Sequence, residues 1–436
     1  MDLNALGKWL GWLLMAGYLA LTVTELPRFF TSALGPVPEG APAAEAPVSR
    51  RRLFCEVLAA FVASRLLVAL VCAVGFWIQE KTLSGFFGAL WENLFPWDAY
   101  HYIDIIQNGY VATDEARLFI VFFPFYPMAC RCLTLMTGIS ATAAALVVSN
   151  AALAGCGAAM YRLCEMDGGQ VRGRRAMLLL MFNPMTYFYS ISYSESTFLL
   201  VTLLAVLFAR RRKFFPAVLC GALASGARLL GMATAIPIFW ELLRDCRERH
   251  GAAPASGRDY VRWIALSVLK VLPVSLGFLG YLSLNWHLFG NATQFMVFQR
   301  EHWFQEFGHL GNTFQYCLYN SVIYDDHQYQ LGVWRPQVLL LVAIPLLVLW
   351  QREASPLGRR KRTQPGDVAY TLVYHYVSFA PTWLLSGPRY ASCNYALYPM
   401  LADIPKRRRG FAIMLALECA LLGYMTWIGL WLGKVY

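Results

Sequence analysis

The chain of 436 residues consists of long apolar runs that alternate with short polar or basic loops. A hydrocarbon core about 30 Å thick needs roughly 20 apolar residues for each helix that crosses it. Runs of this kind begin at Trp9, Phe54, Ala141, Trp263 and Phe411. The pattern predicts an all-α, polytopic membrane protein in which residues 1–436 form a single integral membrane domain.

Shorter apolar runs complete the predicted set of helices. The run from Phe214 to Leu243 has Arg228 at its middle, and an isolated charge at mid-bilayer is costly. We therefore expect two half-length helices that meet at Arg228. Two helical hairpins and one further crossing are also predicted, at Ala176 to Tyr189 with Ser194 to Ala209, at Val368 to Leu385 with Tyr390 to Ile404, and at Pro336 to Trp350. The total is about 12 transmembrane helices.

Residues 79–139 form the first outer loop in this interpretation. The stretch from Leu118 to Ile139 is apolar, but it contains Pro124 and Pro127 and carries Arg131. Such a stretch favours an amphipathic helix that lies at the membrane surface over a helix that crosses the bilayer. A second outer loop, polar and rich in aromatic residues, covers residues 290–334.

Basic residues gather in the remaining loops and set the predicted orientation. The clusters lie at 50–52, 172–175, 210–213, 244–262, 359–362 and 406–409. Cytoplasmic loops carry an excess of Lys and Arg, so we assign these clusters to the cytoplasm. Successive loops then alternate between the two sides of the membrane without contradiction, and both termini lie outside. Residues 35–52 are rich in Pro, Ala and Gly and end in three arginines, which predicts a flexible, basic cytoplasmic linker.

The composition agrees with a membrane protein. Hydrophobic residues make up 58% of the chain and charged residues 14%, whereas about one quarter of a soluble domain is charged. An ordinary soluble enzyme is therefore excluded. The net charge of +11 comes from short loop clusters, so nucleic acid is not an expected partner. Most of the eleven cysteines lie inside apolar runs, which indicates small buried hydrophobes rather than a disulfide framework.

Polar segments with titratable groups share the outer side of this topology. Asp98 follows Trp97 in the first outer loop, and partial burial beside an indole raises the pKa of a carboxylate towards that of a working general base. The alternative is that Asp98 caps a surface helix that begins near Ala99. Convergence of charges beside a membrane predicts one cavity that Asp98 shares with three further residues on this side, Glu195, Arg228 and Arg389.

Several sequence blocks, taken in order, resemble one family of membrane glycosyltransferases. They are W-D-A-x-H-x-x-x-I from Trp97, G-Y at Gly109, F-F-P-F-Y-P from Phe122, N-P at Asn183, Y-S-E-S from Tyr193, R-x-x-G from Arg228, Gln299 with His302 and Trp303, and P-R-Y from Pro388 through Tyr398 and Pro399. From Trp97 to Pro399 the chain resembles the GPI mannosyltransferase II family (the PIG-V type). Eukaryotic members typically read R-S-N-G where this chain reads Arg228-Leu229-Leu230-Gly231, which favours a bacterial relative.

The resemblance implies a C-type glycosyltransferase architecture and a polyprenyl-phosphate sugar donor, mannose in this family. It implies that Asp98 is the catalytic base, which deprotonates the acceptor hydroxyl for an inverting displacement. Arg228 and Arg389 are candidates for holding the lipid phosphate, because a guanidinium matches phosphate bidentately. The alternatives are an ion pair of Arg228 with Glu195, snorkelling of Arg389 to the lipid headgroups, and helix capping by Glu195.

Further residues of these segments are candidates for donor or acceptor binding. His101 would bind the acceptor or orient Asp98, although a lone histidine is more often simply hydrogen-bonded. Aromatic faces and amides suit a sugar ring, but Trp and Tyr are also ordinary anchors at the membrane interface. The additional candidates are His101, Glu115, Gln299, His302, Trp303 and Tyr390.

Neither a metal nor a cofactor is expected. Asp325, Asp326 and His327 have the form of a metal triplet, but a solvated loop is the better interpretation. The expected partners are the bilayer, the lipid-linked donor and a glycolipid or glycan acceptor on the non-cytoplasmic face. The membrane is the plasma membrane in a bacterium or the endoplasmic reticulum membrane in a eukaryote. Two rival functions are a non-catalytic subunit and a lipid or solute transporter, whose polar groups would gather near the midplane.

Overall fold

The computed structural model describes residues 2–35, 46–82, 84–251, 255–353 and 363–431. Within these ranges the chain is helical, and its extended pairing is confined to one antiparallel bridge between Phe307 and Pro381. The all-α prediction is confirmed. Most of the predicted linker at 35–52 and all of the basic cluster at 359–362 lie outside the described residues.

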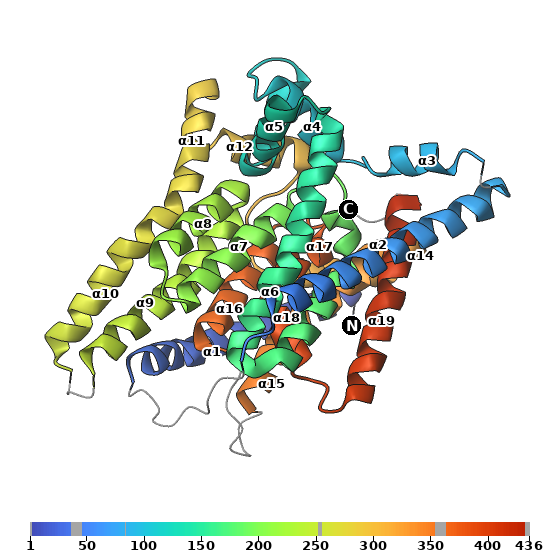
Figure 1. Cartoon of the computed structure of the whole chain (residues 1–436). Coiled ribbons are helices and arrows are strands. Elements are labelled where there is room, and N and C mark those ends of the chain that lie inside the picture. The colour runs from blue at the N-terminus through green and yellow to red at the C-terminus, as the bar shows by residue number, and fades with distance from the viewer. Residues whose placement is uncertain (1, 36–45, 83, 252–254, 354–362, 432–436) are drawn as a thin grey trace.

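Long helices alternate with short helices and with 3-10 or π turns, named η (Figure 1). The first half contains α1 Leu3–Leu34, α2 Arg50–Glu80, α3 Phe86–Asn93, α4 Ala99–Asn108, η1 Glu115–Val121, α5 Phe125–Thr137, α6 Ala141–Met181, η2 Thr186–Tyr189, α7 Glu195–Arg210 and α8 Phe214–Ala227. The second half contains η3 Leu229–Thr234, α9 Ala235–His250, α10 Gly257–Val271, η4 Leu272–Ser275, α11 Leu276–Phe289, α12 Gln294–Trp303, α13 Leu310–Ile323, α14 His327–Tyr329, η5 Gln330–Trp334, α15 Arg335–Glu353, α16 Pro365–Phe379, α17 Gly387–Ser392, α18 Leu397–Ala402, α19 Arg408–Thr426 and η6 Trp427–Trp431.

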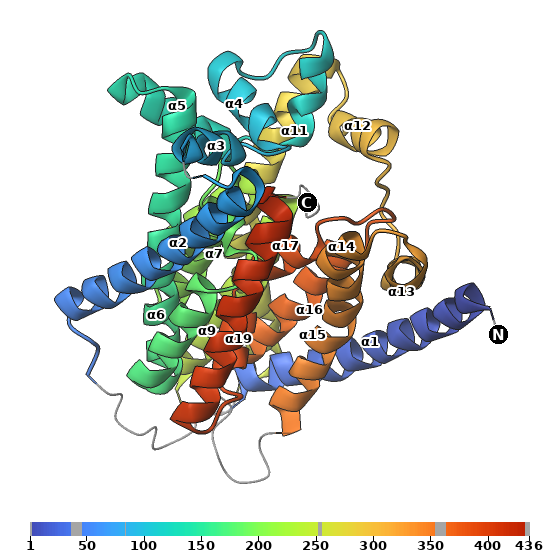
Figure 2. The same cartoon turned by 90° about the vertical axis from the view of Figure 1, so that its right-hand side faces the viewer.

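The predicted outer-loop segments collect at one end of the helical body. In Figure 1 and Figure 2, α3, α4, α5 and α12 lie together at the top and the C-terminal end of α15 lies at the bottom. Figure 1 also shows the C-terminal end of α9 at the bottom. The last turn of α9 carries Arg247 and Arg249. The polar segments and this basic cluster are therefore at opposite ends, as the orientation prediction requires.

Six stretches of the described chain are long and apolar enough to cross a bilayer, or seven if η1 and α5 together form one bent span. They are Leu3–Leu34, Arg50–Glu80, Ala141–Met181, Gly257–Phe289, His327–Gln351 and Arg408–Leu430. By contrast, α7, α8, α9 and α16 have 14 to 16 residues, so each is about 21 to 24 Å long. The predicted number of about 12 crossings is not confirmed by helix length and stays a prediction.

The chain reverses direction within α6. Gly169 interrupts the helix with a φ of 82°, a left-handed conformation that favours glycine. On the two sides of this break, Gly173 lies against Tyr161 and Gly157 lies against Met177. These contacts make the two halves of α6 an antiparallel pair, with small residues where the helices touch. The second half is the first arm of the hairpin that the sequence predicts before Glu195.

Two predicted helices are shorter than the apolar runs that suggested them. The run from Ala176 to Tyr189 leaves the helix after Met181, because Pro184 cannot continue it and the residue before a proline avoids helical geometry. The run from Tyr390 to Ile404 is wrong as a single helix and forms parts of α17 and α18. Between them, the side chain of Asn394 accepts a hydrogen bond from the main-chain N–H of Ala396 at 3.3 Å, a local turn that competes with the helix.

The structure confirms the predicted break at Arg228. Helix α8 ends at Ala227, Arg228 is extended with φ −160° and ψ 151°, and η3 follows. Likewise, η1 and α5 meet at an angle of 113°. The stretch from Leu118 to Ile139 is therefore not one straight helix, and its location at the membrane surface stays a prediction.

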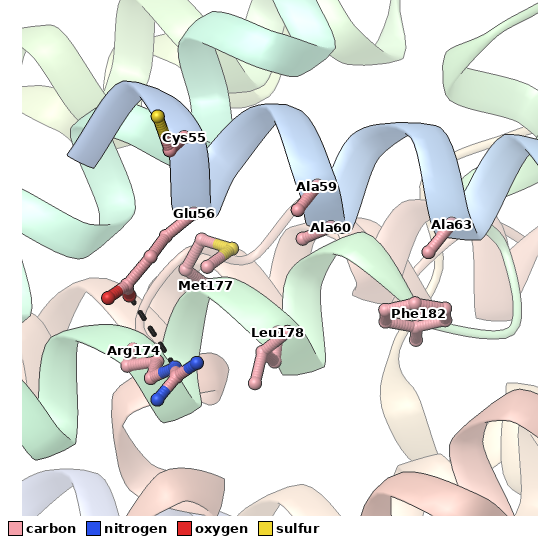
Figure 3. Close-up of a pocket in the computed structure, with 9 residues that line it drawn as sticks. All are labelled: Cys55, Glu56, Ala59, Ala60, Ala63, Arg174, Met177, Leu178 and Phe182. Carbon is pink, nitrogen blue, oxygen red and sulfur yellow. Dashed lines mark ion pairs between the residues drawn. The ribbon is translucent and has the colours of Figure 1, made fainter. Parts of the chain in front are cut away.

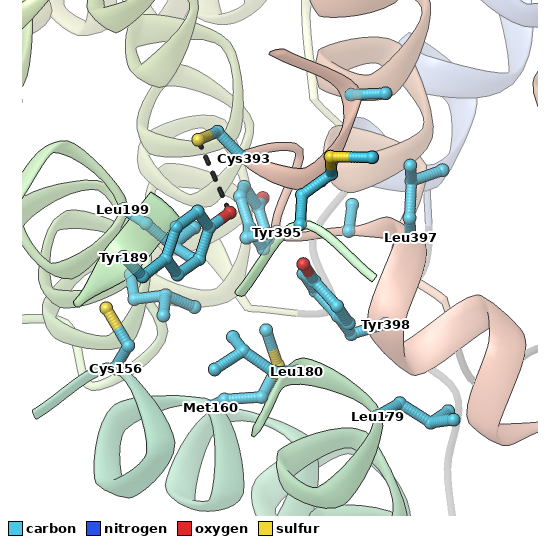
Figure 4. Packing of buried hydrophobic residues seen from close by; sticks show 14 of the residues in the cluster. Cys156, Met160, Leu179, Leu180, Tyr189, Leu199, Cys393, Tyr395, Leu397 and Tyr398 are labelled. Carbon is cyan, nitrogen blue, oxygen red and sulfur yellow. Dashed lines mark hydrogen bonds between the residues drawn. The ribbon is translucent and has the colours of Figure 1, made fainter. Parts of the chain in front are cut away.

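Buried side chains of α6, α7, η2 and α17–α18 form much of the core (Figure 4). The hydroxyl of Tyr189 points to Sγ of Cys393, the residue directly after α17. The hydroxyl of Tyr189 lies 3.0 Å from Oγ of Ser392, and the hydroxyl of Tyr398 donates to the carbonyl of Ser392 at 2.5 Å. Because buried hydroxyls need partners, these bonds hold α17, the short helix that carries Arg389, in one position.

Ion pairs join four helices at the end of α7 opposite to Glu195. Arg210 pairs with Asp167 of α6 at 3.5 Å, with Glu241 of α9 at 3.0 Å, and with Asp367 of α16. Its side chain is only 5% exposed, and breaking a buried pair leaves an uncompensated charge. The network fixes the helices beneath the polar end of the body.

Candidate active site

Asp98 lies directly before α4, as the helix-cap alternative requires, but its side chain makes no capping hydrogen bond. Its Oδ2 instead lies 3.6 Å from Nη1 of Arg389, which is 291 positions away in the sequence. The side chain of Asp98 is 30% exposed. The predicted helix start near Ala99 is confirmed, and the alternative that the carboxylate serves as its cap is wrong.

Backbone strain precedes Asp98. Trp97 has a φ of 46°, in the left-handed region that bulky residues rarely adopt. Such a conformation costs of the order of 1–3 kcal/mol and persists only where its surroundings enforce it. The Trp97 ring packs at 6.2 Å from the ring of Phe188, and the hydroxyl of Tyr193 donates to the carbonyl of Pro96 at 3.2 Å. These contacts hold the loop in the position that directs Asp98 towards Arg389.

Arg389 is buried between two acids and three aromatic rings. Its Nε lies 3.4 Å from Oε1 of Glu195, on the side away from Asp98. The guanidinium carbon lies 5.2 Å from the ring of Phe188, 5.1 Å from that of Tyr193 and 5.4 Å from that of Tyr390. With 7% of its side chain exposed, Arg389 cannot reach lipid headgroups, and the snorkelling alternative is wrong.

Glu195 is the first residue of α7 and is fully buried. Oε1 of its carboxylate pairs with both Arg228 and Arg389. Ser194, the residue before it, makes no capping bond with its own hydroxyl. The carboxylate therefore joins two arginines from different parts of the chain, and its place in the first turn of α7 also suits the helix dipole.

Arg228 is held by the Y-S-E-S segment. Its Nε and Nη2 donate to Oγ of Ser194 at 3.2 and 3.1 Å, and Nη2 also pairs with Glu195. The same Oγ accepts a hydrogen bond from the hydroxyl of Tyr102 at 3.1 Å. The ion pair with Glu195, one of the two predicted alternatives for Arg228, is thus present. Together, Ser194 and Glu195 engage Nε and Nη2 of the guanidinium.

The four charged residues form a continuous chain, Asp98 to Arg389 to Glu195 to Arg228. They come from the start of α4, from α17, from the start of α7 and from the break after α8. Two positive and two negative groups balance one another. A buried network of this kind is stable only while all members remain, so it sets a rigid geometry around Asp98, its most exposed acid.

His101 lies one turn after Asp98 on α4. Its ring packs on Phe119 at 4.4 Å and on Phe122 at 5.4 Å. Burial lowers the pKa of the imidazole, and the neighbouring carboxylates of Asp98 and Asp104 offset part of this effect. No hydrogen bond joins His101 to Asp98 in the part of the chain that the structure describes. His101 is therefore a mostly neutral ring in the wall of the site.

Phe122 connects α12 to α4. Its ring contacts Tyr102 at 5.0 Å and Trp303 at 6.3 Å, both edge to face. Gln299 lies one turn before Trp303 and donates to Oε1 of Gln305 at 3.3 Å. The structure thus brings Trp303 to the aromatic wall that Phe122 shares with His101, whereas the Gln299 amide bonds within its own loop.

Two other binding candidates, Glu115 and His302, lie apart from the network of four charged residues. Glu115 is exposed at the start of η1, with no ion pair among the described residues, and His302 is exposed and packs on Phe298 at 6.0 Å. Asp326 accepts bonds from the start of α14, and one ring nitrogen of His327 lies 3.4 Å from Gln330. Tyr390 meets the network through its ring alone, 5.6 Å from Arg228. No group of three metal-binding side chains occurs in the described ranges.

Several residues that shape the site were not predicted from the sequence. Ser194 and Tyr102 stood inside the quoted blocks but were not selected, and the ring of Phe188 gave no signal at all. Arg65 gave a clear one, because it is a charge in the middle of the apolar run that begins at Phe54. Its Nη1 donates to the carbonyl of Thr186 in η2 at 3.0 Å.

Comparison with known proteins agrees with the resemblance. A family model for mannosyltransferases of the PIG-V type matches residues 64–320. Over 201 residues the chain is 28% identical to GPI alpha-1,6-mannosyltransferase 2 of Rattus norvegicus, an alignment that covers 44% of this chain and 40% of the rat protein. Because the family model covers more than half of the sequence and several helices are long enough to span a bilayer, the chain is a multi-pass membrane protein that belongs to the PIG-V mannosyltransferase family.

Proposed function

We propose that the protein transfers mannose from a polyprenyl-phosphate mannose donor to a hydroxyl of a glycolipid or glycan, at the non-cytoplasmic face of its membrane. Family membership supports the sugar and the class of reaction. The observation that carries the proposal is the contact between Asp98 and Arg389 at 3.6 Å. It joins the acid of the first outer loop to a buried network of charged residues at the polar end of the molecule.

Asp98 is the proposed base. Its side chain is 30% exposed, whereas that of Glu195 is fully buried, so only Asp98 is open to an incoming acceptor. The carboxylate takes the hydroxyl proton as the acceptor oxygen forms a bond to the anomeric carbon. The bond from that carbon to the phosphate oxygen breaks, and the lipid phosphate leaves with the electron pair. Attack from the face opposite the phosphate inverts the anomeric centre.

Arg389 is the proposed partner of the leaving phosphate. A guanidinium offers several N–H groups in a fork that fits a phosphate, and Arg389 lies beside the base. An approaching phosphate competes with Asp98 for this cation. As the pairing with Arg389 weakens, the carboxylate becomes a stronger base. Arg228, already bound to Ser194 and Glu195, then acts by positioning Glu195.

The test is transfer of radiolabelled mannose from polyprenyl-phosphate mannose by the purified protein, with analysis of the product. Asp98→Asn removes the base and keeps the volume, so transfer should fall at least about a hundredfold. Asp104→Asn is the matched control, because Asp104 lies on the same helix and, among the described residues, accepts a side-chain hydrogen bond from Asn108 alone, at 2.9 Å. Equal transfer by Asp98→Asn and Asp104→Asn would refute the assignment of the base and favour the non-catalytic subunit.

The transporter alternative is less favoured. Among the described residues, the charged chain around Asp98 joins segments at one end of the body, whereas transport sites lie near the bilayer midplane. If liposomes with the purified protein moved the labelled lipid across the membrane without forming a mannosylated product, the transporter reading would replace the transferase.

A further inference from the structure

Arg65 is a cation without a carboxylate partner in the described part of the chain. It lies in the middle of α2, where its Nε donates to Oγ of Ser64 at 3.3 Å and its Nη1 donates to the carbonyl of Thr186 at 3.0 Å. Its Nη2 is buried and has no hydrogen-bond partner. Arginines within membrane helices pair with other groups or mark the path of a substrate, so this guanidinium has both a charge and a donor to offer.

The proposed reaction needs such a charge. The lipid phosphate is an anion before the transfer and gains negative charge when it leaves. The network of four charged side chains that begins at Asp98 and ends at Arg228 has no net charge to offset it. Arg65 approaches the same site from the side of α2. It binds the first residue of η2, and the ring of Phe188, two residues further on, faces Arg389 at 5.2 Å. The two guanidiniums therefore both contact one short turn, which is about 8 Å long.

Helix α2 lies along α6 with a groove on each side. The groove in Figure 3 has a volume of about 380 Å³, and Glu56 and Arg174, whose charged groups lie 3.5 Å apart, pair across it. Its wall on α2 consists of Cys55, Glu56, Ala59, Ala60 and Ala63. Residues 63 and 65 point in different directions on a helix, so this first groove is not on the Arg65 face of α2.

The second groove is on the Arg65 face. It has a volume of about 290 Å³ and is lined by Arg50, Leu53, Phe54, Val57, Leu58 and Phe61 of α2 and by Ala154 and Ala158 of α6. Phe61 is its last residue on α2, and Arg65 follows one helical turn later on the same side. An apolar groove that leads to an unpaired cation fits a lipid with one long chain and an anionic head.

We infer that Arg65 binds the phosphate of the polyprenyl-phosphate lipid, and that the second groove holds the first part of its chain. The identity of this lipid as donor and product rests on the proposed function. A phosphate beside η2 then meets Arg65 and Arg389, and the sugar projects towards Asp98. Arg65 supplies the positive charge that the neutral chain of four residues lacks.

Binding of dolichyl phosphate to the purified protein in detergent tests this assignment without any sugar transfer. Arg65→Gln keeps an N–H donor for the carbonyl of Thr186 but loses the charge, so affinity should fall at least about tenfold. Arg65→Lys should restore most of it. The matched control is Arg131→Gln, because Arg131, like Arg65, donates to main-chain carbonyls, here those of Ile106 at 3.4 Å and Gln107 at 3.3 Å, and has no carboxylate partner among the described residues. The neutral lipid dolichol should bind every variant alike.

The groove has its own test, which also covers the case in which Arg65→Gln does not fold. Ala154→Phe fills the groove and leaves Arg65 in place, so it should weaken the binding of dolichyl phosphate but not that of inorganic phosphate, which has no chain to place in the groove. Unchanged binding by Arg65→Gln, an equal loss for dolichol, or equally good competition by phosphatidylglycerol would overturn the inference. If binding depends on Arg65 but the wild type transfers no mannose, the inference stands and the proposed function fails.

Discussion

Arg389 lies between Asp98 and Glu195, with Nη1 at 3.6 Å from one carboxylate and Nε at 3.4 Å from the other. The two acids differ in access, because Glu195 is fully buried and Asp98 is partly open. Glu195 therefore serves as the fixed counter-ion, and the pairing of Arg389 with Asp98 is the contact that an incoming phosphate can exchange. This arrangement couples arrival of the donor to the strength of the base.

Arg389→Lys should lower kcat by about 10- to 100-fold, which corresponds to about 1.4–2.7 kcal/mol. Lysine keeps the charge but not the planar fork, so it cannot hold two carboxylates and a phosphate at fixed angles. Steady-state transfer at saturating donor gives kcat. Arg300→Lys is the control, because the side chain of Arg300 is 59% exposed and its Nε is as far as 4.0 Å from the carboxylate of Glu306. A kcat within twofold of the wild type would exclude Arg389 from the reaction.

Glu195→Gln should destabilise the protein strongly. It leaves two buried guanidiniums without their shared counter-ion, and removal of one partner from a buried pair costs about 3–5 kcal/mol. The thermal midpoint of the purified protein in detergent measures the effect. Glu248→Gln provides the comparison, because the side chain of Glu248 is 32% exposed and its pairs with Arg212 and Arg244 contribute little. Equal midpoints for these two variants would mean that Glu195 is not a structural counter-ion.

Much of the site could be predicted because charges in apolar surroundings are conspicuous. Asp98, Glu195, Arg228 and Arg389 each stand in or beside a membrane run, where a charge is costly unless it is paired. The prediction that these four side chains meet required only that their polar segments lie on the same side of the membrane. The break at Arg228 followed from the same physics, since the extended backbone there lets the guanidinium turn to Ser194.

Other features depend on contacts that no local pattern reveals. The aromatic enclosure of Arg389 involves Phe188, an ordinary apolar residue in the sequence, and the strained φ of Trp97 arises only because η2 packs against it. The break between α17 and α18 is a turn at Asn394, which a hydropathy run conceals. Arg65 was predictable from its isolation alone, but its partner at Thr186 was not.

The His101 ring should make the fold sensitive to acid. Burial lowers its pKa below the ordinary value of 6.5, so in acid the unfolded chain binds a proton that the folded protein resists. Stability is therefore complete above about pH 6.5 and falls as the pH drops from there towards the lowered pKa of the folded state. His101→Gln should show a smaller loss of thermal midpoint between about pH 7.5 and pH 5.5. An identical loss in variant and wild type would assign the acid sensitivity to other groups.

The orientation of the body can be tested with two engineered cysteines. Glu301 is exposed on α12, among the outer segments, and Arg249 is 75% exposed in the last turn of α9, in a basic cluster. The exposed native thiols of Cys55 and Cys132 are first replaced by serine. A membrane-impermeant maleimide should then label Glu301→Cys from the non-cytoplasmic side of intact cells or sealed microsomes, and Arg249→Cys only after the cytoplasmic side becomes accessible, because basic loops stay in the cytoplasm. Labelling of both positions from the same side would contradict the predicted orientation. The site of Asp98 and Arg389 could then not be assigned to the non-cytoplasmic face, where the donor is proposed to bind.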